Sequence, residues 1–344
     1  MLQGSRDQLN GSYCTLEREV ANLKIAVIMP TLARPTFLHA LQSVRKQSVT
    51  PNEVLILSDE KLTTELRCNE RFMLSTQGFL DKVRLALDST PCDLVTFVDD
   101  DAEIDQRWLE NMRRWFRYDS TGFVCGSCLP LLDSYSTTVD RAICLVEQSY
   151  FGSFLMSRRY KLGRQELNPD ETRLIGMGMY RREILLRILV QEWEKIAASA
   201  WENIVFTCMA ESQCDLIYDP SASFYHRPRS SLWSFFKQIM KSGNGRAVYF
   251  RLNKNELLRK SYMLMPSLFL LYLVILPLLF PASRILRLPL YIYAIALALA
   301  TLAKIGSEST RAVLLFPVVV FVQHIAYGAG FIRGLLTAPI RKWS

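Results

Sequence analysis

The amino-acid sequence predicts an α/β fold in which a mainly parallel, Rossmann-like sheet is covered by helices on both faces and followed by membrane-spanning helices. One observation is the alternation of short β-branched runs with amphipathic segments across residues 24–230, which is typical of parallel sheets. The other is a change in composition. Beyond residue 260, charged residues become rare, and Leu, Ile, Ala, Val, Phe and Tyr dominate.

These observations divide the chain into four predicted parts. Residues 1–23 are an N-terminal extension, and 24–230 form the α/β domain. Residues 231–260 are a basic, amphipathic region expected at a membrane interface, and 261–344 are the transmembrane region. The length of 344 residues accommodates one domain of about 250 residues plus such an appendage.

The first strand and helix of the domain are predicted from apolar spacing. Lys24–Met29 is a β-branched run closed by a proline, and it predicts a buried strand. Pro35 suits the first turn of a helix. In that helix Phe37, Leu41 and Val44 fall on one face, which we expect to pack on the sheet.

The following elements continue the alternation. Glu53–Ser58, Arg71–Ser75 and Asp93–Val98 are predicted strands. Phe79–Leu87 reads as an amphipathic helix, and Gln106–Arg117 as the helix after the fourth strand. Because parallel sheets bind ligands at the carboxyl ends of their strands, the residues after each strand are candidates for a site.

Polar residues follow three of these strands. Thr31 and Asp59 end the first two, and Asp99, Asp100 and Asp101 follow the fourth. We therefore expect all five side chains to converge on one crevice. Carboxylates stacked at the exit of a buried strand need neutralisation, and a divalent cation is the usual means. Alternate residues of an extended segment point the same way, which places Asp99 and Asp101 on one side.

Three apolar segments, at about 262–280, 287–303 and 312–336, are predicted membrane spans. The first has 19 residues, which is about 28 Å of helix. A hairpin plus one interfacial helix is the alternative, because the charges of the connecting loops give a mixed positive-inside signal.

The third apolar segment carries features of helix packing. Gln323 and His324 should face other helices or water. Ala326, Gly330 and Gly334 are spaced four apart, which permits close helix contact. A homo-oligomer formed through the membrane helices is a further expected partner.

The chain has a formal charge of +8, and basic residues gather just before the first apolar segment, at Arg246, Arg251, Lys254, Arg259 and Lys260. Such a cluster suits the anionic face of a bilayer. The basic residues form neither a recognition helix nor an arm, so we expect no nucleic-acid partner.

The cellular setting is predicted from the N-terminus and the cysteines. The N-terminus lacks a basic region followed by an apolar core, so no signal peptide is expected and the domain should be cytoplasmic. The eight cysteines are then reduced thiols. Cys125 and Cys128 have redox spacing, but we interpret them as part of a buried strand.

Several stretches, in this order, resemble inverting glycosyltransferase family 2. They are AVIMPTLARPTFLHALQSVRKQSVTPNEVLILSD, LVTFVDDD and GMGMYRREIL. The first is similar to the family's opening strand, Pro-Thr turn, helix and second strand with its aspartate. The second resembles its Asp-x-Asp element, and the third its acceptor-side Gly-x-Gly loop. The order holds across residues 24–250, and the apolar C-terminus is similar to that of lipid-directed members, such as archaeal membrane mannosyltransferases.

The resemblance implies a GT-A fold and sugar transfer from a nucleotide donor with Mg²⁺ or Mn²⁺. It implies Asp101 as the main metal ligand, with Asp99 contacting the metal or the ribose and His226 as a further ligand. The implied donor-binding residues are Pro30, Thr31, Arg34, Asp59, Arg84, Asp99, Asp100 and Arg246. The implied acceptor-side residues are Gly176, Gly178, Met179 and Trp201.

Some of these residues have a structural alternative. Asp59 could cap a helix over Glu60–Arg67, and Thr31 and Arg34 could belong to a turn. Arg84 could be an exposed helix arginine. His226 follows the strand-like run LIYDPSASFY, where a lone histidine is often structural.

Arg246 lies in a segment with two interpretations. Its glycines and cations suit a phosphate. An apolar face beside Lys237 and Lys241 instead suits a helix lying on the membrane. That face consists of Trp233, Phe236, Ile239 and Met240.

The catalytic base departs from the family pattern. Relatives usually have Glu-Asp at a helix start, whereas this chain has Glu202-Asn203. Asparagine cannot accept the acceptor's proton, so we expect Glu202 to be the base. The alternatives are a base elsewhere or an inactive protein.

The expected function is that of a multi-pass, metal-dependent, inverting glycosyltransferase of the cell membrane. It would move a sugar to a hydroxyl of a membrane lipid or lipid-linked glycan. Mannose from GDP-mannose is favoured from the resemblance, with a UDP-sugar next. The rivals are a UDP-sugar-using polysaccharide synthase and an inactive nucleotide-sugar-binding membrane scaffold.

Overall fold

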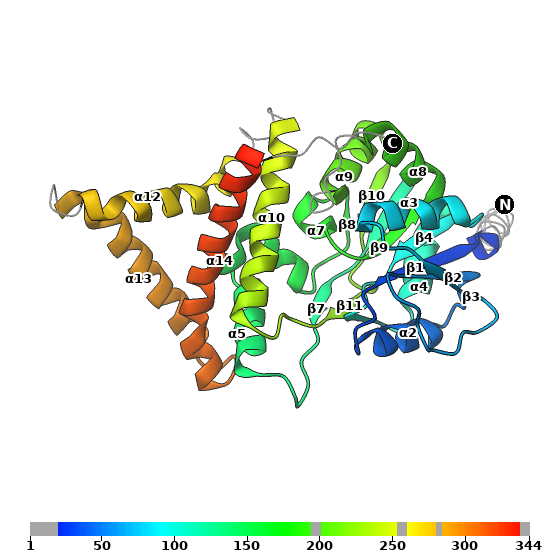
Figure 1. Cartoon of the computed structure of the whole chain (residues 1–344), viewed down its shortest axis with the longest axis horizontal. Helices are drawn as coiled ribbons and strands as arrows, with labels where there is room; N and C mark the ends of the chain where they lie inside the picture. Colours follow the sequence, from blue (N-terminus) through cyan, green and yellow to red (C-terminus); the bar gives the residue numbers. More distant parts are fainter. Residues whose placement is uncertain (1–19, 194–200, 253–259, 280–283, 338–344) are drawn as a thin grey trace, which may run out of the picture. The chain divides into compact units, whose positions relative to one another are not determined.

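The computed structural model describes residues 20–193, 201–252, 260–279 and 284–337. The chain forms two compact units (Figure 1). The first consists of Met1–Leu131, Lys161–Glu192 and Val205–His226, and the second of Leu132–Tyr160, Trp193–Ile204 and Arg227–Ser344. Most of the predicted N-terminal extension lies outside the described residues. Lys254 and Arg259 of the basic cluster also lie outside them.

The first unit is built on an eight-stranded sheet with the order β3-β2-β1-β4-β9-β6-β10-β8. Its strands are β1 (Ile25–Thr31), β2 (Glu53–Ser58), β3 (Glu70–Leu74), β4 (Leu94–Phe97), β6 (Thr121–Cys125), β8 (Glu166–Leu167), β9 (Gly178–Arg181) and β10 (Asp215–Tyr218). Strands β1 to β4 are mutually parallel, whereas β9 is antiparallel to both of its neighbours and β8 is antiparallel at the edge. The mainly parallel α/β fold is confirmed.

The central strands are apolar throughout because both faces of the sheet are covered. Every residue of β1 from Ile25 to Met29 is fully buried. Helix α2 (Phe37–Arg45) buries its predicted apolar face, and α3 (Phe79–Ser89) does the same. Helices α3 and α8 (Arg182–Glu192) pack together over one face, and α2 and α4 (Trp108–Arg113) lie on the other (Figure 1).

A second, three-stranded sheet has the order β5-β11-β7. Its strands are β5 (Ala102–Ile104), β7 (Cys128–Pro130) and β11 (Phe224–His226). The run LIYDPSASFY is thus two strands, β10 and β11, that belong to different sheets. Cys125 ends β6 and Cys128 begins β7, and both are buried, which confirms their interpretation as strand residues.

Three local expectations were wrong. No helix follows Asp59 in Glu60–Arg67, so Asp59 does not cap one. Gln106–Arg117 contains the short helix α4 and then a 3-10 helix, η1 (Arg114–Arg117), instead of one continuous helix. Asp99–Asp101 is not extended but forms a turn, in which the Ala102 N–H donates to the Asp99 carbonyl at 3.2 Å.

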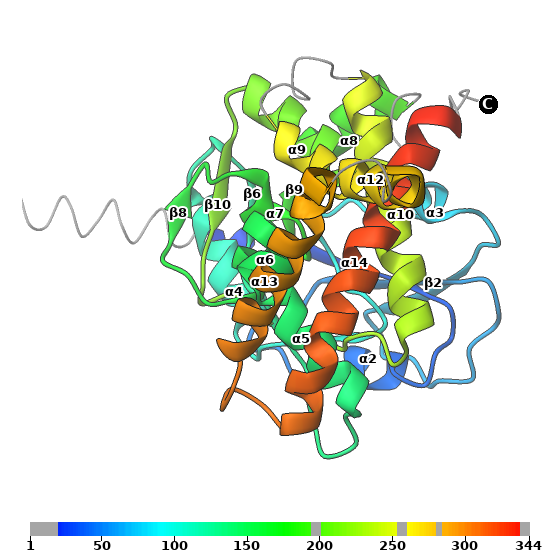
Figure 2. The same cartoon turned by 90° about the vertical axis from the view of Figure 1, so that its left-hand side faces the viewer.

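The second unit is helical. Its longer helices are α5 (Thr138–Glu147), α10 (Leu232–Leu252), α12 (Met265–Leu279), α13 (Leu288–Leu302) and α14 (Thr310–Thr337). Helices α5, α10 and α14 lie side by side around a common apolar core (Figures 1 and 2). The unit also contains α6 (Tyr150–Ser153) and the 3-10 helices η2 (Phe154–Tyr160), η4 (Ser261–Leu264) and η5 (Arg284–Arg287).

Helices lie at all three predicted apolar segments. Within the described part of the chain, two are long and apolar enough to cross a membrane, namely 284–302 and 310–336. Ser261–Pro277 is shorter, and Phe280 lies outside the described residues. A count of three membrane spans therefore stays a prediction.

The small residues of α14 pack as predicted. A Cβ on Gly330 would lie 2.0 Å from the Met240 carbonyl oxygen, and one on Gly334 would lie 2.5 Å from that of Asn244. Both glycines therefore face α10 of the same chain. The small-residue face proposed for self-association is occupied within the second unit.

Candidate functional site

The carboxyl ends of β1, β2 and β4 lie at one edge of the large sheet. Thr31 pairs with Ser58 across β1 and β2, and Ile28 pairs with Phe97 across β1 and β4. Asp59 directly follows β2, and Asp99 lies two residues beyond β4. The structure therefore brings Thr31, Asp59 and the segment Asp99–Asp101 to the same edge of the sheet, as the strand pattern predicted.

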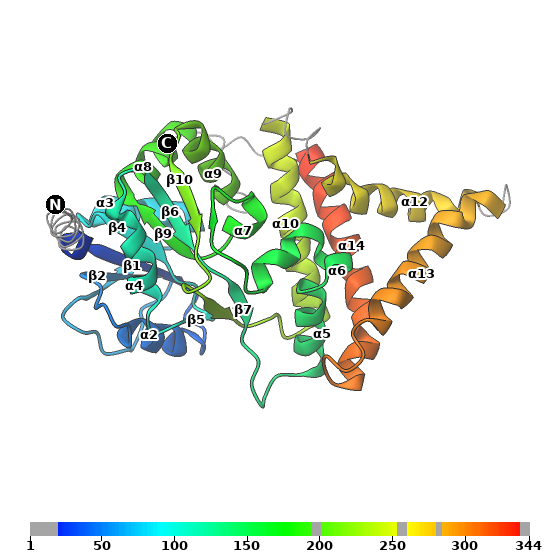
Figure 3. The ribbon, with the colours of Figure 1, turned by 180° about the vertical axis from the view of Figure 1, so that it is seen from behind.

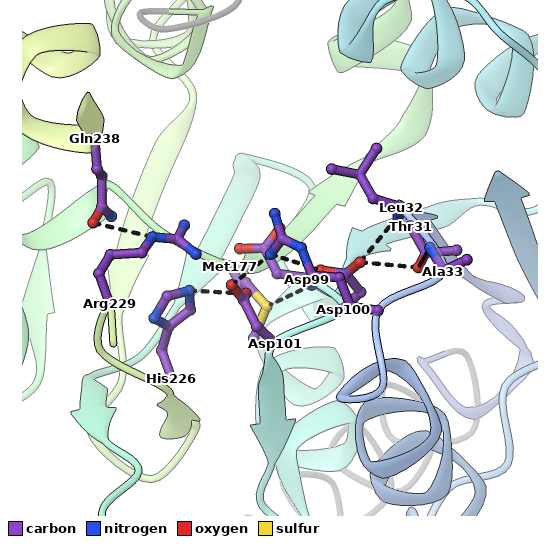
Figure 4. Close-up of polar contacts among 11 residues, drawn as sticks. Thr31, Leu32, Ala33, Asp99, Asp100, Asp101, Met177, His226, Arg229 and Gln238 are labelled. Atoms are coloured by element: carbon purple, nitrogen blue, oxygen red, sulfur yellow. Dashed lines mark hydrogen bonds and ion pairs between the residues drawn. The ribbon is translucent and has the colours of Figure 1, made fainter. Parts of the chain in front are cut away.

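Asp100 is directed into the protein, where it anchors the loop after β1 (Figure 4). One of its carboxylate oxygens accepts hydrogen bonds from the Thr31 hydroxyl at 2.9 Å and from the Leu32 N–H at 3.0 Å. The Thr31 hydroxyl in turn accepts from the N–H of Ala33, which has a left-handed φ of 57°. Asp100 and Thr31 were predicted to contact a donor. In this structure their polar atoms hold the loop in place.

Asp99, Asp101 and His226 form a cluster that could hold a metal ion (Figure 4). One ligand atom from each side chain lies within 4.8 Å of the others. The strand register explains this arrangement, because β11 pairs antiparallel with β5 and places His226 opposite Ala102. The His226 Nε2 lies 3.0 Å from the nearer carboxylate oxygen of Asp101.

The donor atoms of this cluster suit Mg²⁺ or Mn²⁺. Two carboxylates are typical of hard cations, and an imidazole nitrogen widens the choice toward transition metals such as Mn²⁺. The Asp101 side chain is only 10% exposed, so an uncompensated charge there would be costly. The residues fit the cation that the sequence pattern predicted.

Arg34 provides a positive charge beside the aspartates. Its Nη1 lies 2.9 Å from an Asp101 carboxylate oxygen and 3.3 Å from one of Asp100. Its side chain is 39% exposed, so the guanidinium is at the solvent edge of the cluster. Arg34 can therefore neutralise the aspartates when no other cation is present, and it can reach an anionic ligand above them.

Asp59 has a partner that the sequence did not reveal. Lys82, on α3, donates a hydrogen bond to the Asp59 carboxylate. The Lys82 side chain is 5% exposed and that of Asp59 is 44% exposed. A solvent-facing carboxylate is thus held by a buried cation. Arg84, predicted to bind the donor, lies 3.7 Å from Asp88 on the same helix, with 37% of its side chain exposed.

The predicted acceptor-side loop is partly a strand. Gly178 and Met179 belong to β9 in the centre of the sheet, and Met179 is fully buried. A Cβ on Gly178 would lie 2.4 Å from the Phe123 ring, so no larger residue fits. Gly176 lies outside the strand with φ 141°. A role of these residues toward an acceptor stays a prediction.

Met177 is a site residue that the sequence analysis missed. The Asp99 N–H donates to its Sδ at 3.2 Å, which ties the turn of aspartates to the segment before β9 (Figure 4). Predicting this contact requires knowing that β9 pairs antiparallel with β4, and the apolar pattern does not show that pairing. The contact of Lys82 with Asp59 was likewise not predictable, because the sequence shows only that Lys82 lies on an amphipathic helix.

The β10–β11 corner that presents His226 is fixed by Asp219. The Asp219 carboxylate accepts from Arg114 at 2.6 Å and from the Trp115 indole N–H at 2.7 Å. Burial disfavours its charged form, but hydrogen bonds from Trp115, Ser221 and Arg114 outweigh that effect and lower the pKa of Asp219 below its ordinary value. Asp219 is therefore a stable structural anion.

The predicted base lies in the first turn of α9 (Trp201–Glu211). Trp201 and Asn203 are buried, whereas Glu202 is partly exposed. Glu202 belongs to the second unit and the aspartates to the first. Its role as a base stays a prediction.

Arg246 and the glycines that precede it lie within the continuous helix α10, as in the helical interpretation of this segment. Gly243 instead allows α14 to approach, since its Cβ would lie 2.3 Å from the Tyr327 carbonyl oxygen. The buried Nη1 of Arg246 has no hydrogen-bond partner among the described residues. Donor binding by Arg246 stays a prediction.

Residues 26–189 match the sequence model of the family described as Glycosyl transferase family 2. The chain is similar to the mannosyltransferase PcManGT from Pyrobaculum calidifontis, described as a complex with GDP-Man and Mn²⁺. The two chains are 14% identical in sequence, and the structures align with a TM-score of 0.50 over 94% of this chain and 93% of the other.

A second solved structure, described as a mycobacterial protein, aligns at 14% identity and a TM-score of 0.44 over 69% of this chain and 77% of that one. None of the curated proteins matches the chain. At 14% identity, the likeness to the mannosyltransferase shows the fold alone.

Proposed function

The chain is a glycosyltransferase with a family 2 domain over residues 26–189, and from this premise we propose that it is a metal-dependent, inverting enzyme acting at a membrane. It moves a sugar from a nucleotide donor to a hydroxyl of a membrane lipid or lipid-linked glycan. The observation that carries the proposal is the cluster of Asp99, Asp101 and His226 beside Arg34, at the carboxyl ends of the strands.

The site residues have separate roles in this proposal. Asp101, Asp99 and His226 hold a Mg²⁺ or Mn²⁺ ion, which offsets the negative charge of the leaving diphosphate. Arg34 pairs with the diphosphate, and Asp59 accepts hydrogen bonds from the base. Because only interactions stronger in the transition state accelerate the reaction, Arg34 must favour the departing diphosphate over the intact donor.

Inversion needs a carboxylate that takes the proton of the acceptor hydroxyl. Glu202 is the proposed base, because Asn203 stands where relatives usually have an aspartate and cannot accept the proton. Both residues lie at the start of α9, where Asn203 is buried and Glu202 is partly exposed.

The donor is proposed to be GDP-mannose, with a UDP-sugar as the alternative. The support is the description of the structural neighbour as a GDP-Man and Mn²⁺ complex. The lipid acceptor is proposed from the apolar helices of the second unit, two of which are long enough to cross a membrane.

A second candidate function is a nucleotide-sugar-binding scaffold without transfer activity. Asn203 favours it, because the usual base is missing at that position. The scaffold retains metal-dependent donor binding but transfers no sugar, so donor binding alone does not discriminate between the two functions.

Transfer assays with radiolabelled GDP-mannose or UDP-sugars and a membrane lipid extract test the proposal. Wild type should label the lipid fraction. Glu202→Gln should lose about 10²- to 10⁴-fold of that rate while keeping donor affinity, and Asp101→Ala should lose both. Donor binding without transfer across all donors would favour the scaffold. Normal transfer by Glu202→Gln would place the base elsewhere.

A further inference from the structure

Helix α14 passes the length and composition criteria for a membrane span, yet it is a core helix of the second unit. Of its most apolar stretch, 39% of the residues are buried inside the protein. The residues that bury it come from α5 and from Phe235 of α10. The buried α14 residues are Ala312, Val313, Phe316, Val319 and Val320.

Helix α10 runs beside α14 in the same direction. Gly243 packs on Tyr327, and four residues further along Ala247 packs on Gly334. A bilayer that surrounded α14 would therefore also surround α10. Helix α10 carries Lys237, Lys241, Arg246 and Arg251. Charged side chains within the hydrocarbon core are strongly unfavourable, and only those near the helix ends can reach the surface.

The start of α14 is tied to a polar part of the protein. Glu308, just before the helix, forms an ion pair with Arg141 of α5 at 3.2 Å. Helix α5 begins with a capping box, in which Thr137 and Asp140 satisfy each other's backbone N–H groups. The link between α13 and α14 therefore carries a charged contact to the start of α5, and such a contact is unfavourable within the hydrocarbon core.

Helices α12 and α13 have the opposite character. No residue of α13 is buried, and α12 exposes Leu268, Leu271, Val274 and Ile275. Neither 261–279 nor 288–303 contains a charged residue, whereas Arg284, Arg287 and Lys304 flank them. The two helices leave α14 near its opposite ends and meet away from it (Figure 3). Apolar helices bounded by basic residues match the profile of a bilayer.

We propose that α12 and α13 are the segments that enter the bilayer, and that α14 lies along its surface without crossing it. The proposal rests on the membrane attachment in the proposed function and names the part of the chain that contacts lipid. It corresponds to a hairpin with one interfacial helix. Residues 304–309 and the C-terminus then lie on the same side of the membrane, whereas three spans place them on opposite sides.

Protease-cleavable sites test the topology in sealed vesicles of known orientation. One site is inserted after Gly306, in the link between α13 and α14, and the glycine is kept because its φ is 82°. Another site is added after the C-terminal residue. Both should be cut from the same face of the membrane. Cleavage from opposite faces, or recovery of the protein in the soluble fraction, would overturn the proposal. The cleavage pattern does not depend on sugar transfer. An inactive protein would therefore fail the transfer assay but could still show the predicted topology.

Paired lysine substitutions provide a second readout. Ile295→Lys with Leu299→Lys changes two α13 residues that are each 61% exposed. Leu314→Lys with Val318→Lys is the matched control in α14, at 69% and 46% exposure and the same spacing. The α13 pair should reduce carbonate-resistant membrane retention at least tenfold, and the α14 pair should stay within twofold of wild type. Equal losses would show that α14 is also immersed in lipid.

Discussion

Thr31→Val tests whether Asp100 anchors the loop that follows β1. The substitution keeps the shape of the side chain but removes the hydroxyl that donates to Asp100 at 2.9 Å. A hydrogen bond to a charged group contributes about 1.5–3 kcal/mol. The Ala33 N–H also loses its acceptor, but Ala33 is exposed and water can replace it. We therefore expect a loss of about 1.5–3 kcal/mol in unfolding free energy.

The assay is thermal unfolding of the full chain in detergent. For a domain of about 150–250 residues, each kcal/mol shifts Tm by about 2–4 °C, which predicts a decrease of about 3–12 °C. The affinity for GDP should also fall, because the anchored loop carries Arg34.

Thr36→Val is a matched control five residues further along the chain. The Thr36 hydroxyl oxygen is buried and has no hydrogen-bond partner among the described residues. Its removal should leave Tm unchanged or raise it slightly. A Thr31→Val protein that unfolds within 1 °C or so of this control would refute the anchoring role of Asp100.

Three further predictions concern stability. Asp59→Ala should lower the unfolding free energy by about 1–3 kcal/mol, because it leaves the buried Lys82 ammonium without its partner. Lys82→Met should lower it less, since Asp59 is 44% exposed and stays hydrated. Equal losses in thermal unfolding would contradict this. The lowered pKa of Asp219 stabilises the fold above the ordinary carboxyl pKa of about 3.9, and that contribution is lost as pH falls through the folded-state pKa. Asp219→Asn should therefore flatten the decline of Tm below about pH 4, and an unchanged acid profile would show that Asp219 is not the group responsible. Gly330→Ala should lower Tm by several degrees, because its Cβ would lie 2.0 Å from a carbonyl oxygen of α10. Ala329→Gly on the same helix is the control and should have a smaller effect. An unchanged Tm for Gly330→Ala would mean that α10 and α14 can separate.

The strand pattern was sufficient to predict the edge of the sheet that carries the site. Ile25–Met29 and Val54–Leu57 are uninterrupted apolar runs, as expected of parallel strands covered on both faces. Because parallel strands share the direction of their carboxyl ends, the residues after them had to meet. This argument depends only on local pattern, and it placed Thr31, Asp59 and Asp101 correctly at that edge.

Contacts set by strand order and long-range pairing were not predictable from local pattern. β9 lies between β4 and β6 but follows β6 and β8 in sequence, and only its position explains how Met177 reaches Asp99. The turn at Asp99–Asp101 also differs from the expected extended segment. The flanking aspartates still share one side, because Asp100 is drawn inward by the Thr31 hydroxyl and the Leu32 N–H.

The same limit applied to the apolar C-terminal region. Composition identified α12, α13 and α14 as one class of helix. It could not show that α14 is partly covered by α5 and α10, because burial by distant segments leaves no periodic signal in a uniformly apolar helix. The spacing of Gly330 and Gly334 did indicate a helix contact, although not that its partner was Met240 and Asn244 of α10.

The central claim is that Asp101 and its neighbours hold a metal ion against a nucleotide diphosphate. The most direct measurement is thermal stabilisation of the detergent-purified protein by GDP and by UDP, each with and without Mn²⁺, in wild type and Asp101→Ala. At 100 times its Kd, a ligand adds about 2.7 kcal/mol, which is readily visible as a Tm shift. We predict a Mn²⁺-dependent shift with one nucleotide that is lost in Asp101→Ala. No shift with either nucleotide, or one that Asp101→Ala retains, would contradict the claim.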